Sequence, residues 1–257
     1  MGPMIDRSRK TLSRRTVLRG TLGVAVSAVI AACTRTVRPR AGATPTPTLT
    51  STPASTATAM PSCIVRPSLT EGPYFVDEKL NRSDIRSDPS DGSVSPGVPL
   101  RIVMNVGSVD GSSCTTLAGA LVDIWHCDAA GVYSGVASEG SAGKKFLRGY
   151  QATDANGRAE FRTIYPGWYR GRAVHIHFKI RAPAGSSRSY EFTSQLFFDD
   201  ALSDRVYANV PYRSEGGRDV RNTDDGIYRS DGDKLLLALA PEGSGYAGTF
   251  DIGLRMD

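Results

Sequence analysis

The feature that most constrains the fold is a succession of short β-rich runs, separated by turn residues, which begins after Pro99. Apolar or alternating runs bounded by Gly, Pro, Asn and Asp are typical of β-strands. The only helix that we expect is a short one within residues 200–210. The predicted strands cover residues 100–109, 119–127, 146–153, 159–164, 173–182, 190–198, 234–240 and 248–256. The sequence therefore predicts an all-β fold: a β-sandwich of two sheets with long connecting loops and few short helices.

Residues 1–33 have the organisation of an export signal. Basic residues, including the pair Arg14 and Arg15, precede a short apolar stretch that ends in "IAAC" at Cys33. Such a stretch is too short for an ordinary membrane span, and the arginine pair indicates the twin-arginine route. "IAAC" resembles a lipobox, whose cysteine is lipidated. We expect an exported, extracytoplasmic protein anchored to the membrane through Cys33, with a plain cleavable signal and secretion as the alternative.

Residues 34–62 form a Thr-, Pro-, Ser- and Ala-rich segment with little apolar surface, which predicts a disordered linker. We expect a single folded domain over residues 63–257. The net charge of the whole chain is +5, but nine basic residues and one acidic residue lie in positions 1–40. Residues 41–257 then carry 22 basic and 25 acidic side chains, a net charge of −3. This balance argues against a nucleic-acid partner.

Three cysteines lie beyond Cys33, at Cys63, Cys114 and Cys127. In an oxidising compartment, three cysteines predict one disulfide and one remaining thiol, and all three pairings stay open. None of the spacings is the Cys-x-x-Cys typical of a zinc site.

Two of the three histidines lie in "AVHIHF", residues 173–178. Because side chains alternate along a strand, His175 and His177 share one face, with Ile176 on the other. This pair alone fits a metal site or two buried structural histidines equally well. The third histidine, His126, is expected to be structural or to lie at a pocket edge rather than to be a ligand.

Two tyrosines could meet the histidine pair. Tyr133 follows the turn "DAAG", and Tyr169 follows a Pro-Gly turn six residues before His175, so a loop could fold its phenol over the strand. Taken singly, each is more commonly a packing residue with a satisfied hydroxyl. Tyr165 is predicted to pack in the core, and Tyr74 to approach the mouth of a pocket.

Five motifs in a fixed order resemble the intradiol ring-cleavage dioxygenases. They are "TEGPYF" (70–75), "LNRSDIR" (80–86), "GALVDIWHCDAAGVYSG" (119–135), "FRTIYPGWYRGRAVHIHFKI" (161–180) and "SQLFF" (194–198). The chain is most similar to the short, secreted, single-chain branch, and to the catalytic domain of the catechol and protocatechuate 3,4-dioxygenases. The resemblance covers most of residues 63–257.

The resemblance implies a non-haem ferric ion held by Tyr133, Tyr169, His175 and His177. It further places Arg172 and Gln195 in the substrate and oxygen pocket, and implies that Tyr169 and His177 are the axial ligands. The donor chemistry agrees, because imidazole suits iron and a hard trivalent cation favours anionic oxygen, so it can deprotonate phenols. Two phenolates and one hydroxide offset three positive charges, which lowers the cost of burying the ion.

The implied reaction opens the ring of a catechol between its two hydroxyls with O2 to give a cis,cis-muconate. In that reaction Tyr169 leaves the metal, and Arg172 stabilises developing negative charge. Which catechol is used stays open, with residues 136–146 and 212–222 as the expected selectivity loops, and a homodimer also stays open. The alternative function is a tethered β-sandwich module that binds a metal or an aromatic ligand without turnover.

Overall fold

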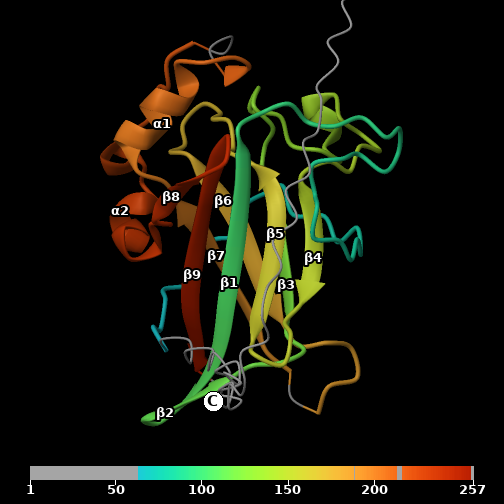
Figure 1. Cartoon of the computed structure of the whole chain (residues 1–257), viewed down its shortest axis with the longest axis vertical. Coiled ribbons are helices and arrows are strands. Elements are labelled where there is room, and N and C mark those ends of the chain that lie inside the picture. Colours follow the sequence, from blue (N-terminus) through green and yellow to red (C-terminus); the bar gives the residue numbers. More distant parts are fainter. Residues whose placement is uncertain (1–62, 188, 213–215, 256–257) are drawn as a thin grey trace, which may run out of the picture. The chain divides into compact units, whose positions relative to one another are not determined.

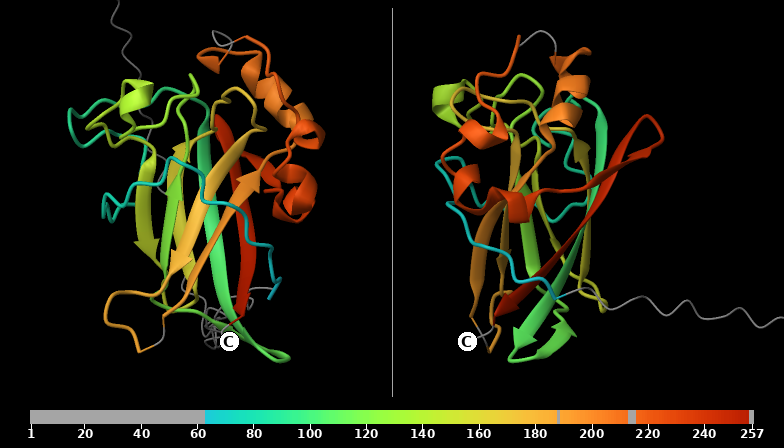
Figure 2. Two further views of the ribbon diagram at one scale, coloured as in Figure 1. Left: turned by 180° about the vertical axis from the view of Figure 1, so that it is seen from behind. Right: turned by 90° about the vertical axis from the view of Figure 1, so that its left-hand side faces the viewer.

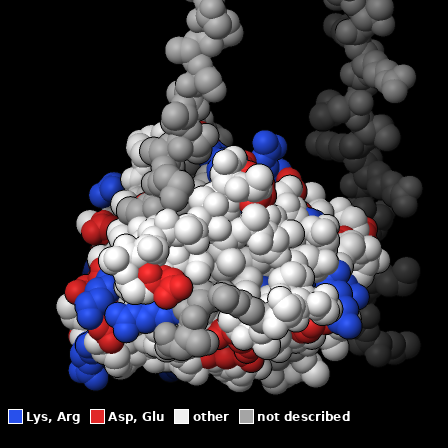
Figure 3. Space-filling view, turned by 90° about the horizontal axis from the view of Figure 1, so that it is seen from below, with Lys and Arg blue, Asp and Glu red and all other residues white. Residues whose placement is uncertain are grey.

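A computed structural model describes residues 63–187, 189–212 and 216–255, which form two β-sheets packed face to face (Figure 1). This confirms the predicted all-β sandwich. The expected export signal and linker, residues 1–62, lie outside the described residues. Among the described residues, no helix is long and apolar enough to cross a membrane. On the face seen in Figure 3, basic and acidic side chains lie interspersed rather than in one basic field.

The first sheet is organised around one long strand, β1 (Pro99–Asp110). β1 pairs in parallel with β9 (Gly245–Arg255) on one side, and β9 pairs with β8 (Leu239–Glu242). The other side of β1 pairs with β5 (Arg158–Ile164) and, at its end, with β2 (Ser113–Thr116). Buried β-branched and aromatic side chains along these strands form one wall of the core.

The second sheet has the order β4–β3–β6–β7, with antiparallel neighbours throughout. Its strands are β3 (Leu121–Trp125), β4 (Arg148–Ala152), β6 (His175–Arg181) and β7 (Glu191–Phe197). In β6, Ile176, Phe178 and Ile180 belong to the core between the sheets. The alternation of the strand therefore places His175 and His177 on its outer face, as the sequence predicted.

Two short α-helices lie along one side of the sandwich (Figures 1 and 2). α1 (Asp200–Tyr207) confirms the expected helix, and it begins where the Asp199 side chain accepts a hydrogen bond from the Leu202 backbone N–H at 2.7 Å. α2 spans Tyr228–Asp231, and single-turn 3-10 helices cover Ala137–Glu139, Asn222–Asp224 and Gly232–Leu235.

The predicted strand at residues 234–240 is wrong in most of its length. Gly232–Leu235 is a 3-10 helix, and β8 begins only at Leu239. The apolar run still alternates, because Leu235 and Leu237 are buried in the core while Leu236 is exposed. Backbone pairing is confined to one bridge between Leu236 and Phe197. The leucines of this segment therefore fill the core although most of the segment is not paired with another strand. A second difference is β2, a strand that the sequence analysis missed.

The "DANG" turn at residues 154–157 joins neighbouring strands that belong to different sheets, β4 and β5. The Asp154 carboxylate accepts hydrogen bonds from the backbone N–H groups of Asn156 and Arg158 at 2.8 and 2.9 Å. Gly157 has a φ of +71°, and a Cβ there would lie 2.4 Å from the Val106 carbonyl oxygen. The turn thus connects the two sheets and packs closely against the backbone of β1.

His126 is a structural residue that connects the two layers, as expected. Its Nδ1 lies 2.8 Å from the Cys127 carbonyl oxygen, so Nδ1 donates, and its Nε2 lies 2.6 Å from Thr163 Oγ1 in β5. The side chain is fully buried, and burial lowers the pKa of His126 to about 4.

The disulfide joins Cys63 to Cys114, and Cys127 is a buried thiol. This decides among the three pairings that the sequence left open. The bond ties the beginning of the domain to β2 across 51 residues of sequence. It therefore restricts a long loop in the unfolded chain.

Replacing Cys114 with Ser is expected to lower the free energy of unfolding by about 2–4 kcal/mol, because the unfolded chain regains the entropy of the open loop. Urea unfolding with and without a reductant measures the effect. Reductant should produce the same loss in the wild-type protein and no further loss in the variant. An unfolding midpoint of the wild-type protein that does not respond to reductant would contradict the assignment.

Stability should fall on acidification through the pH range from 6.5 to 4, because the unfolded chain protonates His126 at its ordinary pKa while burial keeps the folded form neutral. For His126 alone the loss between pH 7 and pH 5 is about 2 kcal/mol. The His126→Gln variant should show a difference between the two pH values that is smaller by this amount. The other buried histidines contribute to both proteins and cancel. An unchanged pH dependence would contradict the neutral state of His126.

Candidate metal centre

Four predicted ligands meet at one point on the outer face of the second sheet. His175 Nε2 lies 3.0 Å from His177 Nε2, 3.2 Å from the Tyr169 hydroxyl and 3.4 Å from the Tyr133 hydroxyl. The two phenol rings meet edge to face, with centroids 5.6 Å apart. Tyr133, His175 and His177 are almost fully buried, and Tyr169 is half-buried. The structure thus brings together four side chains from three separate segments.

The strands position the histidines. His177 pairs in register with Trp125, the last residue of β3, and the indole stacks on the imidazole with centroids 5.0 Å apart and 5° between the planes. His175 opens β6 and pairs with Phe197 at the end of β7. Because both neighbouring strands are regular here, the imidazoles have little freedom to turn away.

Two glycines let the loops that carry the tyrosines pack backbone against backbone. A Cβ at Gly131, where φ is +81°, would lie 2.3 Å from the Trp168 carbonyl oxygen. A Cβ at Gly167 would lie 2.2 Å from the Asp128 carbonyl oxygen, which accepts a hydrogen bond from the Gly167 N–H at 3.0 Å. Neither approach is available to a residue with a side chain. Their contact brings Tyr133 and Tyr169 to the same point.

The protonation of His175 follows from its partner. Its Nδ1 lies 2.7 Å from the Ala173 carbonyl oxygen, which can only accept, so Nδ1 carries the proton and Nε2 presents a lone pair. Burial, with the nearby charge of Arg172, lowers the pKa of His175 to about 3. Burial, with His175 beside it, also holds the pKa of His177 well below its ordinary value. Both imidazoles are therefore neutral, as metal ligands must be.

The phenols are also neutral in the protein alone. Burial raises the pKa of Tyr169 to about 12 and that of Tyr133 well above its ordinary value. A phenolate at this point therefore needs a cation beside it. Two neutral imidazoles and two phenols form a donor set that would pair with such a cation.

The spacing of the donors fits a single metal ion. Two atoms that each lie about 2.1 Å from one cation, at right or tetrahedral angles, are about 3.0–3.4 Å apart, and the measured separations fall between 3.0 and 3.4 Å. Within the described residues, no group of three or more His, Cys, Asp and Glu side chains is placed to hold a metal. The phenols complete the donor set here, and it is suited to ferric iron by its hard oxygen and imidazole donors.

Arg172 and Gln195, the other two predicted site residues, lie beside the four donors and bind each other. Arg172 Nη2 donates to Gln195 Oε1 at 2.6 Å, and Arg172 Nη1 lies 3.5 Å from the Tyr169 hydroxyl and from His175 Nε2. Gln195 is fully buried and donates from Nε2 to the Thr70 carbonyl oxygen at 2.9 Å. The guanidinium therefore faces the point where the donors meet.

Asp225 is a site residue that the sequence analysis missed. Its carboxylate accepts hydrogen bonds from Arg172 Nε and from the Ala173 N–H, both at 2.8 Å. Burial opposes ionisation of Asp225, but these hydrogen bonds outweigh it and hold its pKa below the ordinary value. The pairing spans 53 residues of sequence and no motif marks it, so only the fold could show it.

Tyr74, which the sequence analysis predicted to approach a pocket mouth, contacts both candidate tyrosine ligands. Its ring stacks on Tyr133 with centroids 4.4 Å apart and meets Tyr169 edge to face at 5.9 Å. Tyr165 packs in the core, as expected, and its hydroxyl lies 2.7 Å from Ser203 Oγ. Of the expected selectivity loops, 136–146 lies near Tyr133 in sequence, and 212–222 is described only in part.

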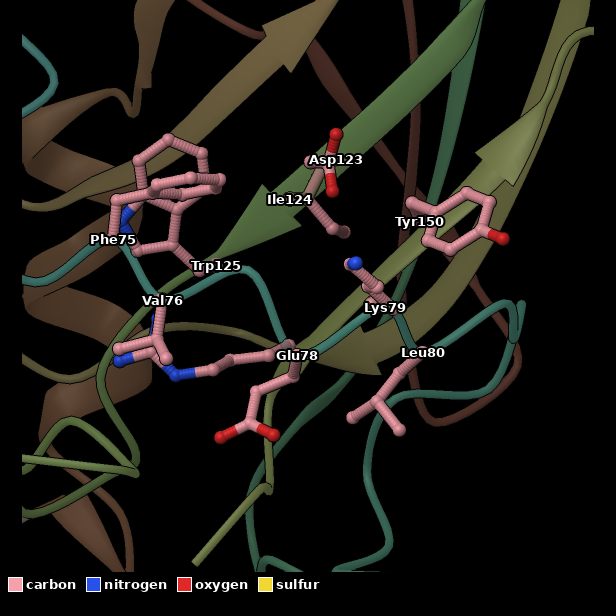
Figure 4. Close-up of a pocket in the computed structure, with 11 residues that line it drawn as sticks. Phe75, Val76, Glu78, Lys79, Leu80, Asp123, Ile124, Trp125 and Tyr150 are labelled. Atoms are coloured by element: carbon pink, nitrogen blue, oxygen red, sulfur yellow. The ribbon is translucent and has the colours of Figure 1, made fainter. Parts of the chain in front are cut away.

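A small cavity lies next to the site on the other side of Trp125 (Figure 4). Its volume is about 10 Å³, which is room for about one water molecule and too little for an aromatic diol. Figure 4 shows the rings of Phe75 and Trp125 together on one side of it and Tyr150 on the other. The cavity is therefore too small to be a substrate pocket.

Comparisons with known proteins show the family of the chain. Residues 70–212, more than half of the chain, match the family model described as "Dioxygenase". An intradiol ring-cleavage dioxygenase from Tetranychus urticae is 31% identical, with a TM-score of 0.64, over 76% of this chain and 95% of its own. The dioxygenase domain of a carbohydrate-binding fusion protein from Streptomyces sp. SirexAA-E is 32% identical, with a TM-score of 0.55, over 76% of this chain and 100% of its own.

Among curated proteins, catechol 1,2-dioxygenase 1 of Acinetobacter lwoffii is 28% identical over 52% of this chain and 49% of its own length. The chain thus spans about half of that relative. A chlorocatechol 1,2-dioxygenase of Pseudomonas sp. strain P51 is 28% identical over 64% of this chain and 71% of its own. With the family model matched across the segments that carry the four converging donors, the chain belongs to the intradiol ring-cleavage dioxygenase family.

Proposed function

We propose that this protein is a non-haem ferric dioxygenase that opens the ring of a catechol between its two hydroxyls. Both atoms of O2 enter the product, a cis,cis-muconate. The observation that carries the proposal is the convergence of four donor atoms: His177 Nε2 and the hydroxyl oxygens of Tyr133 and Tyr169 lie 3.0–3.4 Å from His175 Nε2. The named activities of the catechol and chlorocatechol relatives support the substrate class.

Tyr133, Tyr169, His175 and His177 would hold the ferric ion. When bound, ferric iron would take both catechol oxygens and draw electron density from the ring, which makes a ring carbon reactive towards O2. The buried pair Tyr133 and His175, together with the indole-stacked His177, would keep fixed positions throughout. Tyr169 is the more exposed of the two phenols, and as a phenolate its oxygen would accept a catechol proton to give the neutral phenol.

Arg172 would stabilise negative charge on the substrate. The orientation of its guanidinium group is fixed, because Nε donates to Asp225 and Nη2 donates to Gln195, while Nη1 points towards the four donors. A preorganised cation in a buried site costs no rearrangement when charge develops. Tyr74 would bound the space above the two phenols.

We further propose export through the twin-arginine route and a lipid anchor at Cys33. The catechol substituents would be selected by residues 136–146 and 212–222, and a homodimer is compatible with the family.

A tethered binding module without turnover is the competing function. The complete set of Arg172, Gln195 and Asp225 beside the donors favours the enzyme, because a module that only binds needs no directed cation there.

The purified protein loaded with iron is expected to be red-brown, because a tyrosinate bound to ferric iron absorbs visible light by charge transfer. Tyr169→Phe should alter this absorption band, and His175→Ala should lose most of the iron. Visible spectra and metal analysis measure both effects. Tyr246→Phe, a tyrosine outside the site, serves as the control. A colourless wild-type protein with a full iron content would overturn the ligand assignment.

The same preparation tests the reaction. With catechol, oxygen uptake should accompany the ultraviolet absorbance of a muconate. A yellow semialdehyde would instead indicate cleavage outside the hydroxyl pair. Binding of catechol without oxygen uptake would favour the binding module.

Arg172→Gln is expected to lower kcat by a factor on the order of 10²–10³, because the variant loses a fixed cation at the point where charge develops. Its iron content and visible band should remain close to those of the wild type, since the four ligands are retained. The exposed neighbour Arg170 provides a matched control, and Arg170→Gln should keep full activity. Activity of Arg172→Gln within twofold of the wild type would contradict the role of Arg172.

A further inference from the structure

Arg148, in β4, is a buried cation with no carboxylate partner. The residue is 3% exposed, and among the described residues no Asp or Glu oxygen lies within 4.0 Å of its guanidinium. In the part of the chain that the structure describes, its charge therefore forms no ion pair, and the carboxylate of Glu78 acts on it only from a distance. Buried charges are ordinarily paired, and an unpaired one points to a role that needs the charge.

The guanidinium binds the backbone at two places next to the candidate ligand Tyr133: at Ser134, the following residue, and at Tyr74, whose ring covers that of Tyr133. Nε and Nη2 donate to the Ser134 carbonyl oxygen at 3.0 and 2.5 Å, and Nε also reaches Ser134 Oγ at 2.9 Å. Nη1 donates to the carbonyl oxygen of Tyr74, whose ring stacks on Tyr133, at 2.6 Å. One side chain thus fixes the residue after Tyr133 and the residue that covers its ring.

The charge also faces the Tyr133 ring. The guanidinium carbon lies 6.0 Å from the centroid of that ring. Tyr133 is fully buried, so little solvent screens the interaction. The guanidinium and any negative charge on the Tyr133 side chain therefore attract each other through a medium of low dielectric constant.

Two half-buried arginines show what a purely structural role looks like here. Arg82 also donates to backbone carbonyls, and the carboxylates of Asp84 and Asp88 act on its charge as the carboxylate of Glu78 acts on that of Arg148. Arg218 lies 5.8 Å from the Tyr207 ring centroid and is paired with Asp200 and Asp204. Arg148 differs from Arg218 in that its hydrogen-bond acceptors are neutral, and it differs from both arginines in that a candidate ligand, Tyr133, lies beside it.

We propose that Arg148 is a positioning residue for Tyr133. It fixes the backbone at Ser134, and it supplies the positive charge that the Tyr133 phenolate faces once a ferric ion is bound. The inference rests on the proposed function, because it concerns one of the four proposed ligands. It adds a residue that acts through Tyr133, without contact with the substrate.

The energy of the tyrosinate-to-iron absorption band reports this charge directly. A positive charge beside a phenolate lowers the energy of its electrons, so that moving one of them to ferric iron needs more energy. Removing the charge should therefore shift the band to longer wavelength. A structural role alone would change stability and iron content without a shift that follows the sign of the charge.

The experiment compares the visible spectra of iron-loaded Arg148→Gln and Arg148→Lys with the wild type. Glutamine keeps an amide donor for the Ser134 carbonyl but carries no charge, so its band should move to longer wavelength. Lysine keeps the charge, so its band should stay closer to that of the wild type. Iron content and the thermal unfolding midpoint are measured in parallel to separate loss of metal from the shift.

A second variant, at the half-buried Glu78, keeps the test informative if Arg148→Gln does not fold. Glu78 is a carboxylate whose charge acts on Arg148, and it is paired with Lys145 at 2.8 Å. Glu78→Gln should strengthen the positive field at Tyr133 and shift the band to shorter wavelength. Arg218→Gln is the matched control, since it removes a half-buried arginine beside a tyrosine that is not a proposed ligand, and its band should not move.

The outcomes separate this inference from the proposed function. A wild-type iron protein without the band would overturn both. A wild-type band with no shift in Arg148→Gln, with equal shifts in the glutamine and lysine variants, or with Glu78→Gln shifting in the same direction as Arg148→Gln, would overturn the role of Arg148 alone.

Discussion

The close contact between two loops, around Asp128 to Tyr133 and around Pro166 to Tyr169, is the constraint on which the site depends. Gly131 and Gly167 allow backbone to approach backbone where a Cβ would lie within 2.3 Å of a carbonyl oxygen. One loop continues from β3 and the other leads into β6, so their contact carries the two phenols to the edge where the histidines begin. Without this contact, the phenols and imidazoles would belong to separate surfaces.

Burial then gives these side chains their chemistry. It raises the pKa of both phenols and lowers the pKa of both histidines, so the protein by itself holds four neutral donors at one point. In the protein alone, the two hydroxyls and the two imidazoles have few hydrogen-bond partners at this buried point. A bound cation would ionise the phenols and accept the lone pairs of the imidazoles.

The two arginines beside the donors are held in opposite ways. Arg172 is bound to a buried carboxylate, Asp225, which fixes its direction and offsets its charge. Among the described residues, Arg148 donates to neutral oxygens of Ser134 and Tyr74, and its guanidinium carbon lies 6.0 Å from the centroid of the Tyr133 ring. The candidate site therefore combines one arginine that is paired directly with a carboxylate and one that is held by neutral groups behind the proposed ligand Tyr133.

Local pattern predicted much of the fold and of the site. Alternation marked most of the strands, and it placed His175 and His177 on one face because the side-chain period of a strand is two. The same reasoning failed at residues 234–240, where alternating leucines fill the core from a 3-10 helix and an unpaired segment. Periodicity reports which side chains are buried, but not which backbone groups find a partner.

The reactive side chains could be identified from short stretches of sequence: the two histidines of one strand, the two tyrosines that follow glycine-containing turns, and Arg172 close to His175. Three long-range contacts became visible in the folded chain alone: the pairing of Cys63 with Cys114, the hydrogen bond from Arg172 to Asp225, and the position of Arg148 behind Tyr133. These contacts join residues far apart in the chain, and their strength comes from burial. Neither the distance nor the burial is encoded in any short segment, because both arise when the two sheets and their loops pack together.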